Sequence, residues 1–128
     1  MDRMDTVRRL LGVMVLAGSM LVAQAAPGDE ATMNAEIDHL LAAVAGSDCV
    51  FIRNGDEHAA AAARDHLEMK RKRGRRYYDS TEEFIERIAS RSSWSGKDYR
   101  IRCGSGPEQP AQDWFTHVLQ EYRAAAPQ

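Results

Sequence analysis

Cysteine and proline are scarce in this chain, and neither sign of charge is in large excess. Its 128 residues include 2 Cys and 4 Pro, and 17 Lys and Arg stand against 19 Asp and Glu. This composition, 44% hydrophobic, excludes a collagen-like, a prion-like or a wholly disordered chain. A net charge of −2 gives the chain as a whole no attraction to nucleic acid or acidic lipid. The length allows one domain and excludes two.

A hydrophobic run long enough to cross a membrane is also missing. The apolar stretch over residues 10–22 has about thirteen residues, whereas a spanning helix needs roughly twenty. A head with Arg3, Arg8 and Arg9 precedes this stretch, and the small residues of Ala23-Gln24-Ala25 follow it. These three parts predict a cleavable secretory signal peptide over residues 1–25.

Cleavage would leave residues 26–128 as a single mature domain, with its core at about 33–123. We expect this domain to be exported and not to insert stably into a membrane. The export route, general or twin-arginine, is left open by the sequence.

Apolar residues at helical spacing predict four helices in the mature chain. Asp56 is the expected N-cap of the second, alanine-rich helix, and Ser80-x-x-Glu83 forms a capping box at the start of the third. Residues 90–96 and 104–110 are expected to be a loop and a turn-rich linker. The four helices span about 33–44, 56–73, 80–88 and 111–122.

Two short segments rich in β-branched and aromatic residues predict strands at 49–54 and 98–103. Antiparallel pairing would place six side chains on one face of this ribbon, because successive residues alternate sides. The opposed pairs are Cys49 with Cys103, Phe51 with Ile101, and Arg53 with Tyr99.

The two cysteines therefore predict a disulfide between Cys49 and Cys103. Directly opposed strand residues lie within the distance that a disulfide tolerates, and two cysteines allow one intramolecular pairing. The predicted fold class is α+β: about four helices packed around a small two-stranded antiparallel ribbon, mostly helical, with one disulfide.

Several ordered motifs are similar to those of the YfeK-like family, small exported bacterial proteins with a domain of unknown function. The similarity extends over about residues 33–103. It implies a periplasmic location and supports the disulfide, and it implies no catalytic residues. The motifs include Ser47-x-Cys49-x-Phe51-x-Arg53-Asn54-Gly55, His66-Leu67-x-x-Lys70, and Ser92-Ser93-x-Ser95-Gly96-x-x-Tyr99-x-Ile101-x-Cys103.

Residues with catalytic or metal-ligating spacing are not found. None of His39, His58, His66 and His117 belongs to a ligand motif, and the predicted second helix separates His58 from His66 by too much to share one ion. We therefore expect no enzyme activity, no catalytic residue, no metal and no cofactor.

A basic segment is the strongest charge feature. Residues 70–76 hold six basic side chains, which are interpreted either as a solvated helix end or as a patch for anionic lipid headgroups or polymers. Its candidate binding residues are Arg71, Arg73, Arg75 and Arg76.

A serine-rich loop is the second candidate and supplies Ser93, Ser95 and Tyr99. It is interpreted either as a helix end with local hydrogen bonds or as a Ser-Gly-x-x-Tyr motif resembling that of periplasmic lysozyme inhibitors.

Two functions follow from these features. The first is a non-enzymatic periplasmic binding or accessory module whose partner is an unknown envelope protein or anionic polymer, and not nucleic acid. The alternative is a periplasmic inhibitor of a lysozyme-type cell-wall hydrolase.

Overall fold

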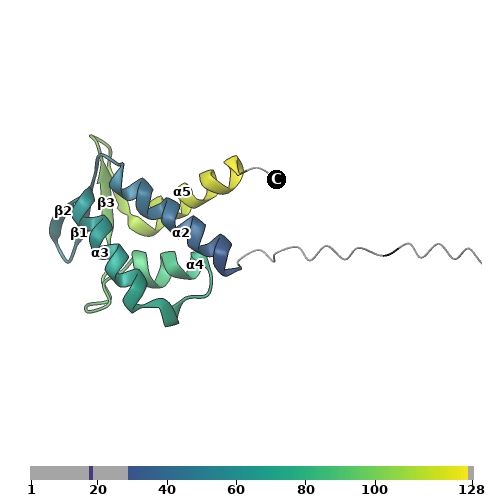
Figure 1. Ribbon diagram of the computed structural model, residues 1–128. Coiled ribbons are helices and arrows are strands. Elements are labelled where there is room, and N and C mark those ends of the chain that lie inside the picture. The colour runs from purple at the N-terminus through teal and green to yellow at the C-terminus, as the bar shows by residue number, and fades with distance from the viewer. Residues whose placement is uncertain (1–17, 19–28, 127–128) are drawn as a thin grey trace, which may run out of the picture.

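A computed structural model describes Gly18 and residues 29–126 of the chain. Apart from Gly18, the predicted signal peptide lies outside these described residues. The described part contains four α-helices, one 3₁₀ turn, one π-helical turn and four strands (Figure 1). In chain order they are α2 (Glu30–Ala45), β1 (Cys49–Arg53), β2 (Asp56–Ala59), α3 (Ala60–Arg73), the 3₁₀ turn Arg75–Tyr77, α4 (Thr81–Phe84), the π turn Ile85–Ala89, β3 (Arg100–Cys103), β4 (Glu108–Pro110) and α5 (Ala111–Ala125).

The strands form one antiparallel sheet in the order β2-β1-β3-β4, and the helices lie to one side of it (Figure 1). The predicted α+β class is confirmed. So is the predicted register of the central pair, because Cys49 lies opposite Cys103 and Phe51 opposite Ile101.

The predicted two-stranded ribbon is too small, since β2 and β4 extend it on both sides. Asn54 and Gly55 both take left-handed backbone angles, with φ of 52° and 86°. Such angles build the two-residue turn that joins adjacent antiparallel strands, so the chain returns along β1 as β2. Asp56 is therefore a strand residue and not a helix N-cap, and α3 begins at Ala60.

The second added strand, β4, lies within residues 104–110, which were predicted to be a linker. Its three residues pair with β3, and α5 follows without a break. The predicted strand over 98–103 is correspondingly shorter, since β3 begins at Arg100, and the first strand ends at Arg53.

The predicted helix ends are otherwise close to those observed. α2 ends at Ala45, with Gly46 as its C-cap. One half of the predicted capping box is present, because the Ser80 hydroxyl accepts a hydrogen bond from the Glu83 N–H at 3.1 Å, whereas the Glu83 carboxylate accepts from the Asp79 N–H. The third helix is interrupted: after α4 the chain widens into a π turn. This turn buries Ile85, Ile88 and Ala89.

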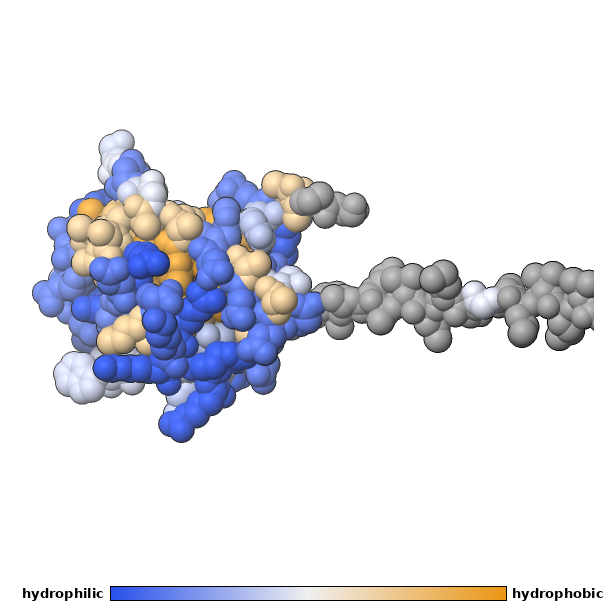
Figure 2. All heavy atoms as spheres, in the orientation of Figure 1, coloured by the Kyte–Doolittle hydropathy of each residue, from blue (hydrophilic) through white to orange (hydrophobic). Residues whose placement is uncertain are grey.

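The core lies between the sheet and the helices. Phe51 and Ile101 face it from β1 and β3, and the apolar stripes of α2 and α5 cover them. Trp114 and Phe115 of α5 both lie against Phe51, with ring centroids 6.0 and 6.5 Å away. The outer surface in the view of Figure 2 is mostly hydrophilic, with hydrophobic residues in smaller areas.

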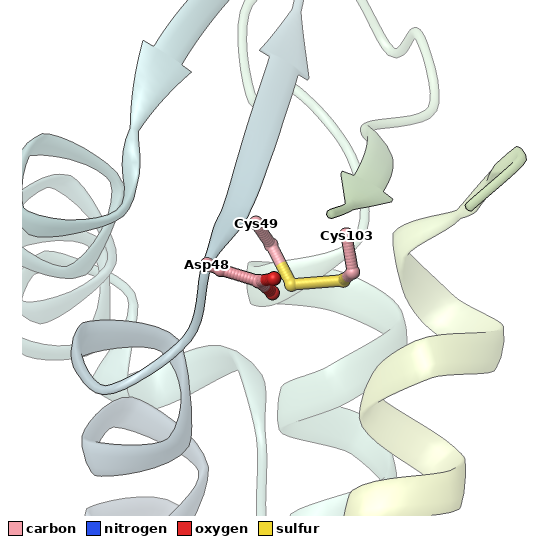
Figure 3. A group of neighbouring side chains, drawn as sticks. All are labelled: Asp48, Cys49 and Cys103. Carbon is pink, nitrogen blue, oxygen red and sulfur yellow. A yellow bond between two sulfur atoms is a disulfide. The ribbon is translucent and has the colours of Figure 1, made fainter. Parts of the chain in front are cut away.

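The disulfide joins the start of β1 to the end of β3 (Figure 3). The Cys49 and Cys103 sulfurs are 2.02 Å apart, and the residues are 54 positions apart in the chain. The predicted disulfide is confirmed, and it closes a loop that contains β2, α3 and α4.

A buried carboxylate links three helices. Glu36 of α2, 5% exposed, accepts hydrogen bonds from the Thr81 hydroxyl of α4 at 2.6 Å and from the Arg123 guanidinium of α5 at 2.6 and 3.0 Å. Glu82 is a second ion-pair partner of Arg123. The hydrogen bonds from Arg123 lower the pKa of Glu36, against the opposing effect of burial, and the Arg123 pKa is raised.

Removing the disulfide is expected to cost much of the stability. The double variant Cys49→Ala/Cys103→Ala should lose about 4 kcal/mol of unfolding free energy, because the unfolded chain is no longer constrained. Urea unfolding of the variant and of the oxidised wild type measures this loss, with the reduced wild type as the control that should match the variant. Equal stability of the oxidised wild type and the variant would contradict the expectation.

Glu36→Gln is expected to lower the unfolding free energy at pH 7 by about 2 kcal/mol, since charged hydrogen bonds are lost. Because the folded pKa of Glu36 is lowered, its contribution is full above the ordinary carboxyl pKa of 4.5 and is lost as the pH falls through the folded value. Urea unfolding at pH 7 and pH 3 should therefore show a smaller difference between wild type and variant at pH 3. Exposed Glu86→Gln is the matched control, and an unchanged difference at the two pH values would oppose this role of Glu36.

Candidate functional site

A groove of about 750 Å³ opens between α3, the hairpin turn after β1 and the loop that precedes β3. Its lining, made of described residues only, contains four Lys and Arg side chains and no Asp or Glu. The lining residues are Arg53, Asn54, His66, Met69, Lys70, Arg73, Gly74, Tyr77, Arg87, Ile88, Ser92, Ser93, Trp94 and Tyr99.

Lys70 lies at the floor of this groove. It continues the buried stripe of α3 that begins with Ala63 and Leu67, one helical turn apart, and it is 7% exposed. Its ammonium donates hydrogen bonds to the Arg91 carbonyl at 2.6 Å and to the Tyr99 hydroxyl at 3.0 Å. Both acceptors are uncharged, so the positive charge has no counter-ion at the floor.

Arg53 brings a second cation to the floor. It is the last residue of β1 and, like Cys49 and Phe51, it alternates toward the face that the helices cover. Burial and the nearby Arg53 charge lower the pKa of Lys70 to about 8. Burial, Arg53, Lys70 and His58 together lower the pKa of His66 to about 4, so the imidazole is neutral at pH 7 while Lys70 is mostly charged.

The remaining cations of the lining differ in their partners. Arg87 forms an ion pair with Glu83 at 2.9 Å and donates to the Tyr77 carbonyl at 3.0 Å, so its charge is compensated. Arg73, the last residue of α3, is exposed. Within the described part of the chain, Arg53, Lys70 and Arg73 are left as three cations without a carboxylate in the groove.

The groove lining also includes exposed apolar side chains. Over residues 29–126, three large hydrophobic side chains are exposed, and all three line this groove. They are Met69, 37% exposed, Tyr77, 51% exposed, and Trp94, 90% exposed. The groove therefore combines buried and half-buried cations with exposed apolar side chains.

The loop that carries Trp94 is held by hydrogen bonds. The Ser92 hydroxyl accepts from the Trp94 and Ser95 N–H groups at 3.2 Å each, and the Ser95 hydroxyl donates to the Asn54 side-chain oxygen at 2.6 Å. Asn54 also donates to the Ser92 hydroxyl at 3.4 Å. Asn54 of the hairpin turn thus holds the loop beside the groove. The hydrogen bonds of the serines agree with the interpretation of this segment as a helix end with local hydrogen bonds.

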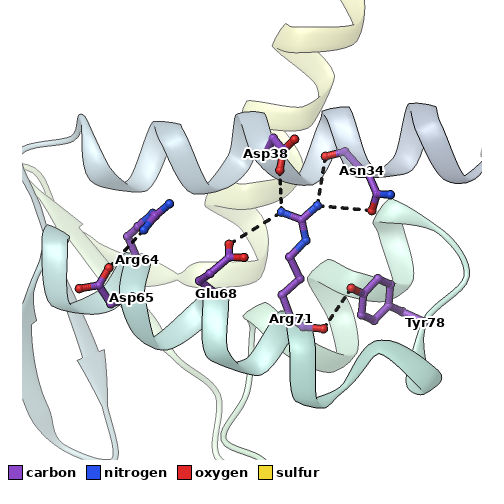
Figure 4. Close-up of polar contacts among 7 residues, drawn as sticks. All are labelled: Asn34, Asp38, Arg64, Asp65, Glu68, Arg71 and Tyr78. Atoms are coloured by element: carbon purple, nitrogen blue, oxygen red, sulfur yellow. Dashed lines mark hydrogen bonds and ion pairs between the residues drawn. The ribbon is translucent and has the colours of Figure 1, made fainter.

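The predicted basic segment does not form one surface. Arg73 lines the groove, whereas Arg71 points to α2, where it pairs with Asp38 at 2.6 Å and bonds to Asn34 (Figure 4). Arg75 donates to the Tyr78 carbonyl at 2.6 Å and pairs with Glu30. Arg76 lies over the Tyr77 ring, 4.9 Å from its centroid.

The serine-loop candidates are also divided. Ser93 and Tyr99 line the groove, and Ser95 supports the loop through Asn54. Tyr99 is 6% exposed beneath Lys70, and burial raises the pKa of its hydroxyl. The two residues of the inhibitor-like motif therefore do not share an exposed surface.

Arg53, Lys70, His66 and Trp94 were not among the predicted binding residues. The signals for two of them were present: strand alternation places Arg53 on the core face, and the spacing of Ala63, Leu67 and Lys70 places a cation on a buried helix stripe. His58 and His66 lie on β2 and α3 and not on one helix, which corrects the predicted arrangement.

One group of potential metal ligands occurs among the described residues: Asp48, Cys49 and Cys103, with ligand atoms within 4.8 Å of one another (Figure 3). Both sulfurs are joined in the disulfide, so neither is a thiolate that could bind zinc. This group is structural.

The family of unknown function DUF5329 matches residues 31–123. The chain belongs to this family. A curated relative, the uncharacterized protein YfeK of Salmonella typhimurium (strain LT2), is 39% identical over 71 residues, which are 56% of this chain and 57% of YfeK. The match thus spans little more than half of that relative, and the family resemblance in the sequence is confirmed.

No solved structure matches this DUF5329 chain. Among its described helices, none combines the length and the apolar character that a membrane span requires.

The electrostatic coupling on the groove floor predicts that Arg53→Gln raises the pKa of both His66 and Lys70, because a neighbouring positive charge is removed. NMR titration of the imidazole and ammonium nitrogens measures both values, which start at about 4 and about 8. Arg64→Gln, an exposed arginine paired with Asp65, is the control and should leave them unchanged. Unchanged values in Arg53→Gln would place Arg53 away from the floor.

Proposed function

We propose that this protein is an exported, periplasmic and non-enzymatic binding module that holds an anionic ligand in the groove. The observation that carries the proposal is the set of three cations, Arg53, Lys70 and Arg73, in a lining without Asp or Glu among the described residues. Like charges that crowd one concave surface repel each other, and an anion would convert that repulsion into attraction.

The burial of the cations at the groove floor favours the binding of an anion. Lys70 is almost fully buried and Arg53 is half-buried, so both are partly withdrawn from water and interact with a charge more strongly than exposed side chains do. Hydrogen bonds from such cations to an anion are among the strong ones in proteins. The Ser93 hydroxyl at the same surface adds a further donor.

A binding role also suits the protonation states. The floor combines charged cations with a His66 whose pKa of about 4 makes it a weak base at pH 7. At pH 7 the floor therefore presents net positive charge, which suits the binding of an anion.

Export is supported by two independent features. The predicted signal sequence over residues 1–25 directs secretion. The Cys49–Cys103 disulfide persists in oxidising compartments such as the periplasm. The partner would then be an anionic polymer or an acidic envelope component.

Titration with inorganic pyrophosphate by calorimetry tests the proposal. Arg53→Gln should weaken binding about tenfold or more, because a charge-assisted hydrogen bond is lost, and exposed Arg73→Gln should weaken it severalfold. Lys72→Gln, which changes the same charge beside Arg73 but outside the lining, is the matched control and should bind like the wild type.

Salt and pH provide further readouts of the same titration. Affinity should fall as salt rises, because the attraction is screened. It should also fall as the pH rises through about 8, because Lys70 then loses its proton and the anion prefers the charged form. Binding that is absent, or that is equal in the wild type and Arg53→Gln, would overturn the proposed function.

A further inference from the structure

The lining of the groove is rich in hydrogen-bond donors and poor in acceptors. Arg53, Lys70 and Arg73 can only donate, and the Asn54 side-chain oxygen already accepts from Ser95. A ligand with many hydroxyl groups, such as a neutral sugar, would find few acceptors besides the neutral His66 imidazole and the hydroxyl groups of the lining, and it would bring no charge to the three cations. A ligand that supplies several acceptors therefore suits this lining better than a neutral sugar does.

The charge of the lining sets a second condition. Three cations lack a carboxylate in the groove, so one carboxylate on the ligand would leave most of the positive charge without a partner. A phosphomonoester carries about −1.5 to −2 charges at pH 7 and three acceptor oxygens on one compact group. Its charge and its acceptor oxygens suit a groove with Lys70 and Arg53 at the floor and the exposed Arg73 in the same lining.

The exposure of the lining residues sets a third condition on the ligand. Lys70 and Tyr99, 7% and 6% exposed, are the deep residues, whereas the apolar side chains of Met69, Tyr77 and Trp94 are the exposed ones. A ligand that enters with its charged group first would keep its other end beside these apolar side chains. All three line the same groove, so an apolar part of a ligand held there would have side chains to contact.

We propose that the groove binds a phosphomonoester of an apolar alcohol, with the phosphate on Arg53, Lys70 and Arg73 and the apolar part against Met69, Tyr77 and Trp94. This inference rests on the proposed function, because it names the chemical class of the anion. Substitution of Trp94 tests this inference separately from the proposed function, because Trp94 contributes to the apolar contact and carries no charge.

Calorimetric titration with hexyl phosphate, inorganic phosphate and 1-hexanol tests the inference. Hexyl phosphate should bind about tenfold more tightly than inorganic phosphate, the gain expected when about two methylene groups leave water. The uncharged 1-hexanol should bind far more weakly than hexyl phosphate. Hexyl sulfate, with the same chain and one negative charge, should bind several times more weakly than hexyl phosphate.

Trp94→Ala should remove most of the gain for hexyl phosphate and leave the affinity for inorganic phosphate unchanged. Trp94→Phe keeps an aromatic face and should retain most of the gain. Because Trp94 is 90% exposed, neither substitution should affect folding, which circular dichroism checks.

The possible outcomes separate the two proposals. Equal affinity for hexyl phosphate and inorganic phosphate, or a gain that persists in Trp94→Ala, would overturn this inference while the anion site stands. Binding of 1-hexanol as tight as that of hexyl phosphate would also overturn it. Failure of every anion, pyrophosphate included, would overturn both proposals.

Discussion

The register between β1 and β3, fixed where Cys49 is bonded to Cys103, determines where the groove residues lie. From that bond, two steps of strand alternation lead along β1 to Phe51 and then to Arg53, always on the face that the helices cover. The same steps back along β3 lead through Ile101 to Tyr99, the residue that directly precedes the strand. A shift by one residue would turn Arg53 and Tyr99 to the other face and would remove the floor of the groove.

The two buried charged side chains Glu36 and Lys70 differ in whether they have a partner of opposite charge. Glu36 has Arg123 and Thr81 as partners, and this set joins three helices. Lys70 has only uncharged acceptors, and the charge that acts on its pKa is another cation, Arg53. A buried charge with a partner serves the fold, whereas a buried charge without one costs stability. This difference is the reason that we propose a ligand with a counter-charge for Lys70.

The fold could be predicted from the sequence where local and long-range signals agree. Apolar alternation and the cysteine pair gave the same register, so the central strands were predicted correctly. At residues 54–59 two local signals competed: Asn54-Gly55 favours a hairpin turn, and Asp56 favours a helix N-cap. The edge of β1 decided between them, because its unpaired backbone groups could be satisfied by β2.

The sequence by itself determined the family, the α+β class, the disulfide and the residues that face the core, because these depend on periodicity and on pairing along the chain. Only the tertiary structure decided which cations act together. Residues 70–76 look like one basic patch in the sequence, yet the turn of the helix and of the chain after it directs Arg71 to α2, Arg75 to Glu30 and Lys70 to the groove. Distance in space, and not in sequence, sets the strength of a charge interaction, and so Arg53 acts on Lys70 across the fold while Arg73 lines the same groove.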